Sequence, residues 1–412
     1  MAILLLMTTD ISRLSELSVE IWEKILRHAM YVPDFLDPDA FEGIIFDAPH
    51  AFQVDRPLRN DGNVYWTAER QRTLLRLVCK SWNDHCNLPR FQHRFVQMKD
   101  IWHNKIGGVS LKTAIRVNFY LGGCLCVERC MKAFLDDSGA FHRRYKAFCF
   151  HIIASVGPTR MEIVDFSALN VDDLAGFVDF QNMKNVKTLV STGSSYNSLT
   201  VLSREMQCLT HFHTNAPFWI TGPLTSLRSS SLVSLCFHSI GVAKCEGVVW
   251  HLPSLLHLGV VDNGHFSSVT FLHDFLVPIL HMVGSRLRSL YVSGGRFEHK
   301  IPSTIWDMCP ELERIHAPLD MDAPPPDFHP LRTVSLSYLD FKTASILEMA
   351  APIFTWPNLR KVIVNTEWDW IGVNESLEFW TRKLEIWSRL GIRLEDRNGD
   401  TFDSFIQSIR KD

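Results

Sequence analysis

The chain has 412 residues, a formal net charge of −3 at pH 7, 46% hydrophobic residues and 21% charged residues. One hydrophobic core usually spans no more than about 250–300 residues, so we expect two units, or one unit with a repeat array. The ordinary composition excludes extensive disorder, and the small net charge offers no broad attraction to nucleic acid or anionic lipid. We therefore expect neither nucleic acid nor a membrane as a partner.

The first residues, MAILLLM, form a short apolar run without a basic region or a small-residue cleavage site, which is not typical of a signal peptide. Later apolar runs such as FLVPILHMVG are far shorter than the ~20 residues that cross a bilayer. The 10 cysteines show no regular pairing, which is typical of free thiols in a reducing compartment. These features predict a soluble intracellular protein, either cytoplasmic or nuclear.

An amphipathic helix is predicted at residues 17–28, LSVEIWEKILRH, because apolar residues recur there at helical spacing. Ser18 stands where a helix cap is favourable, and Glu20 lies in the first turn, where the helix dipole favours a negative charge. The periodicity then fails in VPDFLDPDAFEGIIFDAPH and DRPLRNDGN, which predicts an insertion at about 31–65. A second helical rhythm reaches TLLRLVCKSWNDHC, and each helical segment has an apolar face to bury. We expect the two segments to pack together.

The segments LSELSVEIWEKILRH and LRLVCKSWNDH together resemble the F-box, a small helical module. Its pattern is Leu-Pro-x-Glu-Ile, a hydrophobic helix, and then Val-Cys-x-x-Trp, and the matching residues are Leu17, Glu20, Ile21, Ile25, Leu77, Val78, Cys79 and Trp82. Two features depart from the pattern: Ser18 replaces the usual proline, and the insertion interrupts a module that is normally almost continuous. The insertion, GGCLCVERC and GIRLEDRNGDTF are similar to features of F-box-like proteins of mushroom-type fungi.

This resemblance implies an F-box-like domain at residues 1–100 that docks on a Skp-type adaptor and, through it, on a cullin. The implied adaptor-binding residues, some of which support the interface from the core, are Leu17, Ile21, Ile25, Leu77, Val78 and Trp82. The alternative for the first helix is an ordinary core-facing helix without a partner. A unit of three helices is too small to bury all its apolar faces, which favours one face that another protein covers.

A short unit recurs in the rest of the chain: a leucine or a substitute, two residues, a second apolar residue and often a third. It starts at MEIVDF (161), VKTLVS (186), LTHFHT (209), LVSLCF (232), LLHLGV (255), LRSLYV (287), LERIHA (312), LRTVSL (331) and LRKVIV (359). A strand, a turn, a helix and a loop in roughly 20–29 residues is the plan of a leucine-rich repeat. Because one unit cannot cover its own apolar side, the units must stack into a curved solenoid. The competing interpretation is a βα sheet of another winding.

The predicted fold class is therefore α/β, with a small N-terminal helical F-box-like domain followed by an irregular leucine-rich-repeat-like α/β solenoid. We expect a helical linker or solenoid cap at 101–155, the solenoid at 156–398 and a C-terminal tail at 399–412. Asn398 and Gly399 suit a tight hairpin turn close to the end of the array.

Residues that flank the inner apolar positions of the units should point from the open face of the sheet, because side chains alternate along a strand. The predicted target-binding residues on this face are His211, His213, His238, His257, Tyr291, Arg314 and His316. Histidines there would make a binding surface sensitive to pH. The alternative is a solvated strand face that binds nothing.

Neither a nucleophile elbow nor an H-E-x-x-H motif is present, and GGVSLKT lacks the glycine that a phosphate-binding loop needs before its lysine. Cys124, Cys126 and Cys130 with His151 offer four soft ligands, but their spacing is not that of a zinc finger, so we expect no metal and no cofactor.

The leading hypothesis is a non-catalytic substrate receptor of a cullin-based, SCF-type ubiquitin ligase, in which tethering the target replaces chemical catalysis. The alternatives are a leucine-rich-repeat interaction scaffold without a ligase role and, more distantly, an enzyme with a metal centre near Cys124.

Overall fold

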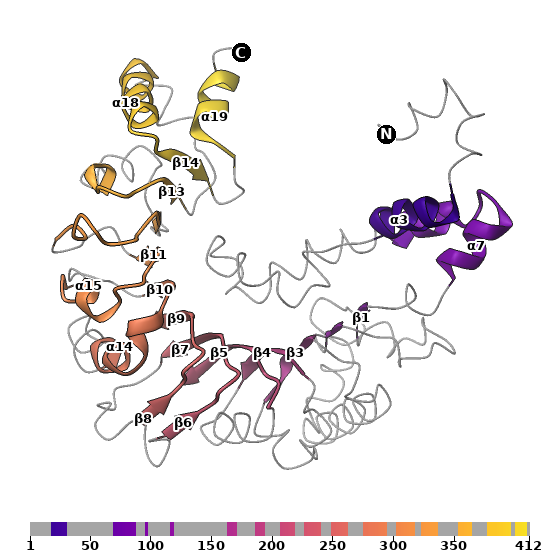
Figure 1. The fold of residues 1–412 in the computed structure, drawn as a ribbon, viewed down its shortest axis with the longest axis horizontal. Helices are drawn as coiled ribbons and strands as arrows, with labels where there is room; N and C mark the ends of the chain where they lie inside the picture. The colour runs from indigo at the N-terminus through magenta and orange to yellow at the C-terminus, as the bar shows by residue number, and fades with distance from the viewer. Residues whose placement is uncertain are drawn as a thin grey trace, which may run out of the picture.

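The structure is a computed structural model. It describes residues 18–30, 69–87, 95–97, 116–118, 163–170, 186–193, 207–218, 226–239, 249–262, 275–294, 302–317, 323–336, 353–364, 377–396 and 400–409. These residues combine helices with a mostly parallel sheet, so the predicted α/β class is confirmed (Figure 1).

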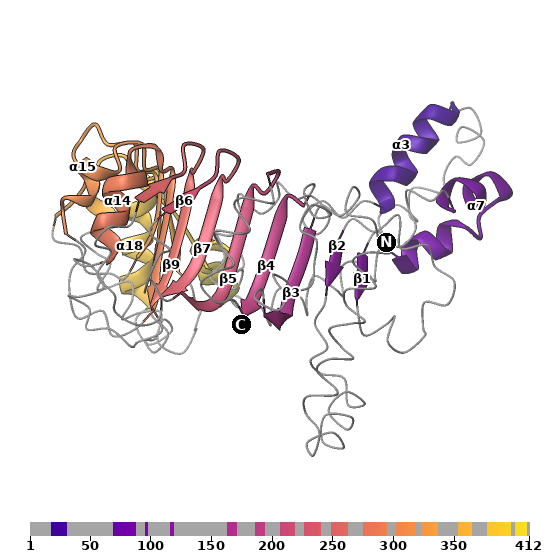
Figure 2. The same ribbon diagram turned by 90° about the horizontal axis from the view of Figure 1, so that it is seen from below.

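The described strands form one 12-stranded sheet and a separate pair. In spatial order the large sheet contains β1 (Phe95–Gln97), β2 (Arg116–Asn118), β3 (Ile163–Asn170), β4 (Thr188–Gly193), β5 (His211–Phe218), β7 (Ser234–Ser239), β9 (His257–Asp262), β10 (Ser289–Gly294), β11 (Arg314–Ala317), β12 (Thr333–Leu336), β13 (Lys361–Val364) and β14 (Arg393–Asp396). The pair consists of β6 (Ser226–Arg228) and β8 (Val249–His251). Each strand of the large sheet lies beside the next one in the chain, apart from the two that form the pair, and Figure 2 shows this row from β1 to β9.

Each repeated unit of the sequence provides one strand of the large sheet, and the strand begins two residues after the start of the unit. Equivalent positions of successive units are paired in parallel register: Ser234 pairs with His257, which pairs with Ser289. The first apolar position of the units is buried at Val186, Leu209, Leu232, Leu255, Leu287, Leu312, Leu331 and Leu359. Each such side chain contributes about 1.5–3 kcal/mol when it is fully buried, so stacking of the units supplies the core.

Hydrogen bonds join each unit to the one before it. The carbonyl oxygen of Lys187 accepts bonds from the backbone N–H groups of Thr210 (2.8 Å) and His211 (3.0 Å), and later units repeat this pattern. The side chain just before the first leucine often adds a further bond, as Ser231 Oγ donates to the carbonyl of Leu209 at 2.9 Å. Asn358 Nδ2 does the same to the carbonyl of His329 at 2.9 Å. Different polar residues thus join successive units.

The described helices of this part of the chain are α14 (Val277–Val283), α15 (Ile305–Met308), α18 (Leu377–Arg389) and α19 (Phe402–Ile409), with 3-10 turns η8 (Gly284–Arg286) and η9 (Ile353–Thr355). α14 packs against β8 and α15. Gly284 permits a close approach between its own backbone and that of Met308, because a Cβ atom at Gly284 would lie 2.7 Å from the carbonyl oxygen of Met308. The remaining labelled helices are α3 (Val19–Met30) and α7 (Lys80–Cys86), close to the N-terminus.

Three elements differ from the sequence-based expectations. β1 lies inside the segment expected to be helical at 1–100, and β2 lies inside the expected helical linker. A strand of three residues is too short to show a hydrophobic period, which is why the pattern did not predict them. Residues expected as a tail include α19, whose Phe402 is fully buried and lies edge-on to Trp380 with ring centroids 6.4 Å apart. Asn398 and Gly399 lie outside the described residues.

Within the described ranges, no helix combines the length and the apolar character that a membrane span requires.

Candidate functional site

The helical unit, which we define as α3, the helical residues 69–75, the turn that follows them and α7, joins two separate parts of the sequence. The indole rings of Trp22 on α3 and Trp82 on α7 lie with centroids 4.9 Å apart and planes inclined by 56°. His85 Nδ1 of α7 lies 3.7 Å from Glu23 Oε1 of α3. Leu26 is buried at the centre of the unit, so the two helices pack against each other as the sequence predicts.

The start of α3 follows from local chemistry. The carbonyl oxygen of Ser18 accepts hydrogen bonds from the backbone N–H groups of Ile21 (3.0 Å) and Trp22 (3.1 Å). A hydrogen bond with the Ser18 side chain, assisted by one with its own backbone, lowers the pKa of the Glu20 carboxyl. The carboxylate therefore stays charged in the first turn, where the helix dipole favours it.

A buried arginine holds the second half of the unit together. Arg72 is only 7% exposed, and its Nη1 donates to the carbonyl oxygen of Cys86 at 3.1 Å. Its Nε donates to Glu69 Oε2 at 2.9 Å, so the guanidinium is paired with a carboxylate. Arg76 Nε donates to Asn83 Oδ1 at 3.1 Å, which ties the turn after residue 75 to α7. Polar bonds therefore fix the interior of this half.

Large apolar side chains lie on the outside of the same unit. The exposed fractions are 45% for Ile21, 40% for Ile25, 65% for Leu74, 79% for Leu77 and 58% for Val78. The turn that carries Leu77 and Val78 is closed by backbone bonds from Leu77 to Leu74 (3.0 Å) and from Val78 to Leu75 (3.2 Å). Exposed apolar residues are unremarkable singly, whereas a contiguous group of them marks a surface that binds a partner.

The structure distinguishes among the predicted adaptor-binding residues. Ile21, Ile25, Leu77 and Val78 are exposed on the helical unit, while Trp82 is half-buried against Trp22 and supports the unit from within. Leu17 lies outside the described residues. The site prediction omitted Leu74, although its helical spacing with Leu77 and Val78 was the signal that could have identified it.

A groove of about 450 Å³ runs between the two helices. Its lining contains Trp22, Glu23, Leu26, Cys79, Ser81, Trp82, Asp84 and His85. The indole pair forms its apolar part, and the carboxylates of Glu23 and Asp84 give it a negative rim.

The predicted target-binding residues on the sheet are largely buried, which differs from the open, solvated face expected from the sequence. His211 is 1% exposed, His257 9%, Tyr291 3% and His316 2%. The rings of Tyr291 and His316 are stacked, with centroids 3.9 Å apart and planes inclined by 11°, so each excludes water from the other. Arg314 is half-buried. The side chains of His213 and His238 lie outside the described part of the structure.

Burial also changes the chemistry of these histidines. It lowers the pKa of His316 to about 3 and is the main reason that the pKa of His257 falls to about 4; His211, Arg314 and Arg288 lower the latter further. Both imidazoles are therefore neutral at pH 7, and neither titrates near neutral pH. The expected pH-sensitive surface does not arise from these two side chains.

Among the described residues, no group of His, Cys, Asp or Glu side chains could hold a metal ion. Cys124, Cys126, Cys130 and His151 lie outside the described residues. Burial raises the pKa of the Cys309 thiol to about 12 and that of Cys236 well above its usual value. These two side chains are thiols at neutral pH and are poor nucleophiles.

No protein-family model matches this chain, and a search of curated proteins finds no match either. The geometry of the helical unit and of the sheet therefore carries the functional argument.

Proposed function

We propose that the chain is a non-catalytic substrate receptor of a cullin-based, SCF-type ubiquitin ligase. The helical unit acts as an F-box-like module that docks on a Skp-type adaptor. The stacked units act as an irregular leucine-rich-repeat-like solenoid that binds a target protein. In this function the chain holds the target close to a ubiquitin-loaded partner, so the rate gain comes from effective concentration and needs no acid, base or nucleophile here.

One observation carries the proposal: the helical unit buries Arg72 and exposes Ile21, Ile25, Leu77 and Val78. An apolar side chain that moves from water into an interface contributes about 1.5–3 kcal/mol when fully covered, so a partner that covers these four gains substantially. The buried polar bonds of Arg72 keep the unit folded without those side chains in its core. The positions also match the apolar positions of the F-box pattern.

The large sheet supports the second half of the proposal. Its strands follow chain order, are paired in parallel and repeat one pattern of buried leucines, which is how stacked repeats build a long surface. Of the predicted target-binding residues, Arg314 is partly exposed. Tyr291 and His316 form a stacked pair beneath the surface.

The test uses the full chain with both apolar positions charged, Ile21→Asp together with Val78→Asp, and co-purification with a Skp-type adaptor. Burying two carboxylates in an apolar interface should weaken binding by at least about 100-fold. A matched control, Val249→Asp with Ile386→Asp, charges two side chains that are equally exposed outside the helical unit, at 55% and 50%. This control should retain the adaptor.

Unchanged unfolding midpoints of both variants establish that each chain is folded. If the unmodified chain fails to bind the adaptor, or if Ile21→Asp with Val78→Asp binds as well as the control, the ligase assignment is wrong. A chain that binds target proteins but no adaptor would instead be a leucine-rich-repeat scaffold without a ligase role.

A further inference from the structure

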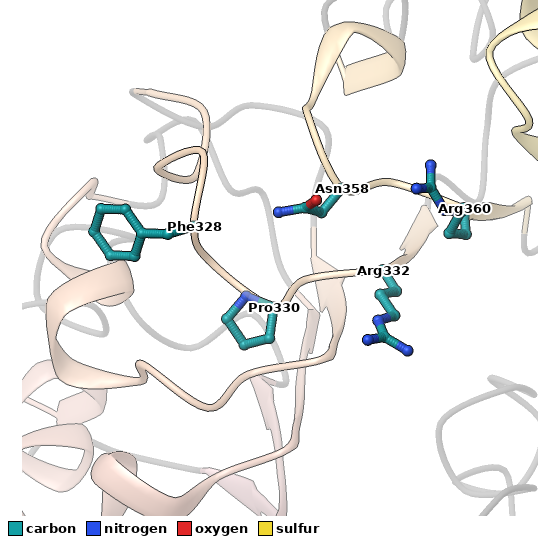
Figure 3. A pocket seen from close by; sticks show the side chains of 5 residues that line it. All are labelled: Phe328, Pro330, Arg332, Asn358 and Arg360. Carbon is teal, nitrogen blue, oxygen red and sulfur yellow. The ribbon is translucent and has the colours of Figure 1, made fainter.

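A second surface feature lies far from the helical unit in the chain, at the start of β12 and β13. A hollow of about 540 Å³ is lined by Phe328, Pro330, Arg332, Asn358 and Arg360 (Figure 3). Arg332 directly precedes β12, and Arg360 directly precedes β13, so the two arginines occupy the same position in successive units. Their backbones are joined by a bond of 2.8 Å from the N–H of Arg360 to the carbonyl of Arg332.

Phe328 projects from a firmly held turn. Its side chain is 89% exposed, while the neighbouring His329 is 4% exposed. His329 Nε2 lies 3.0 Å from the carbonyl oxygen of Cys309 and donates to it. Asn358 Nδ2 donates to the carbonyl oxygen of Asp327 at 2.7 Å, on the other side of Phe328. Because these bonds already order the backbone, a ligand that covers the phenyl ring bears little ordering cost, which is typical of an interface anchor.

The hollow also contains positive charge that no acidic side chain in the described ranges neutralises. Arg332 and Arg360 are exposed, and neither forms an ion pair with an acidic side chain in the described part of the chain. The only hydrogen bond given by the Arg360 guanidinium there goes to the carbonyl of Leu359, at 3.3 Å. Glu395, an acidic residue of β14, the strand beside β13, is already paired with Lys361 at 2.8 Å. The described part of the chain therefore leaves both guanidinium groups available to an external anion.

The directions of these side chains indicate the kind of anion. Figure 3 shows the guanidinium groups of Arg332 and Arg360 pointing away from each other, with Phe328 to one side. Two donors that diverge cannot grip one small anion together, but they can meet two acidic residues of an extended chain. The Asn358 Nδ2 group already donates to two backbone carbonyls, so it positions the turn that carries Phe328.

We propose that this hollow binds an extended acidic peptide segment, whose carboxylates pair with Arg332 and Arg360 and whose apolar side chain packs on Phe328. The inference rests on the proposed function only where it takes the peptide to be the class of target that the receptor would hold. The binding site itself depends only on the charge and geometry of the hollow.

The test titrates the full chain with a fluorescently labelled hexapeptide that alternates glutamate and leucine. Two further probes, alternating lysine with leucine and glutamate with glycine, separate the contributions of charge and apolar contact. We expect the glutamate–leucine peptide to bind most tightly and to weaken as salt is added, because salt screens exposed charges. Tighter binding of the lysine–leucine peptide, equal binding of the glutamate–glycine peptide, or tighter binding of an RNA hexanucleotide would overturn the proposal.

Substitutions of the lining residues test whether the peptide binds in the hollow. Arg332→Gln with Arg360→Gln should weaken the glutamate–leucine peptide by about 2- to 30-fold, as two exposed ion pairs are lost. Phe328→Ala should weaken it by about 10-fold or more. The matched controls are Arg288→Gln, at the same position of an earlier unit, and Phe379→Ala, an exposed phenylalanine of α18, and both should bind as the unmodified chain does.

If the double arginine variant keeps its unfolding midpoint and its affinity for the peptide, the proposed site is wrong. The adaptor experiment is independent, because none of these substitutions lies in the helical unit. If the unmodified chain binds the adaptor but not the peptide, only the proposed site in the hollow is wrong. If it binds the peptide but not the adaptor, the site in the hollow stands and only the ligase role is wrong.

Discussion

The indole rings of Trp22 and Trp82 lie with centroids 4.9 Å apart, although one belongs to α3 and the other to α7, on opposite sides of residues 31–68. This contact unites the two halves of the helical unit. The unit can therefore present apolar residues from both halves, Ile21 and Ile25 from one and Leu77 and Val78 from the other. The integrity of the proposed adaptor site depends on this aromatic pair.

Trp82→Ala should separate α3 from α7, because it removes both the apolar contact and the aromatic pairing, worth about 0.5–1.5 kcal/mol beyond area burial. Hydrogen exchange of the amides in α3 should become faster, and the adaptor should be lost. Trp82→Phe keeps an aromatic ring against Trp22 and should preserve most of both properties. Equal exchange rates in the alanine variant and the unmodified chain would show that the pair does not hold the unit together.

Arg72→Met should destabilise the helical unit by about 1–3 kcal/mol, because it leaves the carbonyl of Cys86 and the carboxylate of Glu69 without their partner. Local hydrogen exchange in α7 measures this loss directly. Arg70→Met is the matched control, since Arg70 is exposed on the same helical stretch. If the two methionine variants exchange at the same rate, the buried arginine has no structural role.

Asn358→Ala should lower the free energy of unfolding by about 1–2 kcal/mol, because the side chain donates two bonds, to Asp327 at 2.7 Å and to His329 at 2.9 Å. Ser254→Ala removes a single bond, to the carbonyl of Ser230 at 2.7 Å, and should cost about half as much. Urea denaturation of the full chain checks both values. A larger loss in the serine variant would contradict the proposed role of Asn358 in joining units.

The pH dependence of stability should reflect the buried histidines. In the folded chain the pKa of His316 is about 3 and that of His257 about 4, against an ordinary value of 6.5 in the unfolded chain. Below pH 6.5 the unfolded state therefore binds protons that the folded state does not, and the free energy of unfolding falls until the pH reaches the folded values.

His316→Phe keeps a ring stacked on Tyr291 but removes one of these titrating groups. Its unfolding midpoint should fall less between pH 7 and pH 5 than that of the unmodified chain, as followed by thermal denaturation. Identical pH dependence in the His316 variant and the unmodified chain would show that His316 does not resist protonation in the folded state.

The local periodicity of the sequence predicted the elements whose apolar residues recur regularly. The spacing of Leu232 and Leu235 recurs from unit to unit, and a strand begins two residues after each start, because stacking buries both positions. The helical spacing of apolar residues such as Ile21 and Ile25 likewise predicted α3. β1 and β2 escaped prediction, since three residues carry no period of their own and pair only where the sheet already exists.

The amino-acid sequence by itself determined the α/β class, the repeating strands and the two helical segments, because each depends on residues close together in the chain. The tertiary structure decided which side chains meet water. His316 is buried because Tyr291 of the neighbouring unit lies across it, while Phe328 stays exposed because Asn358 and Cys309 hold its turn from distant positions. Exposure depends on neighbours brought together by folding, which no local period encodes.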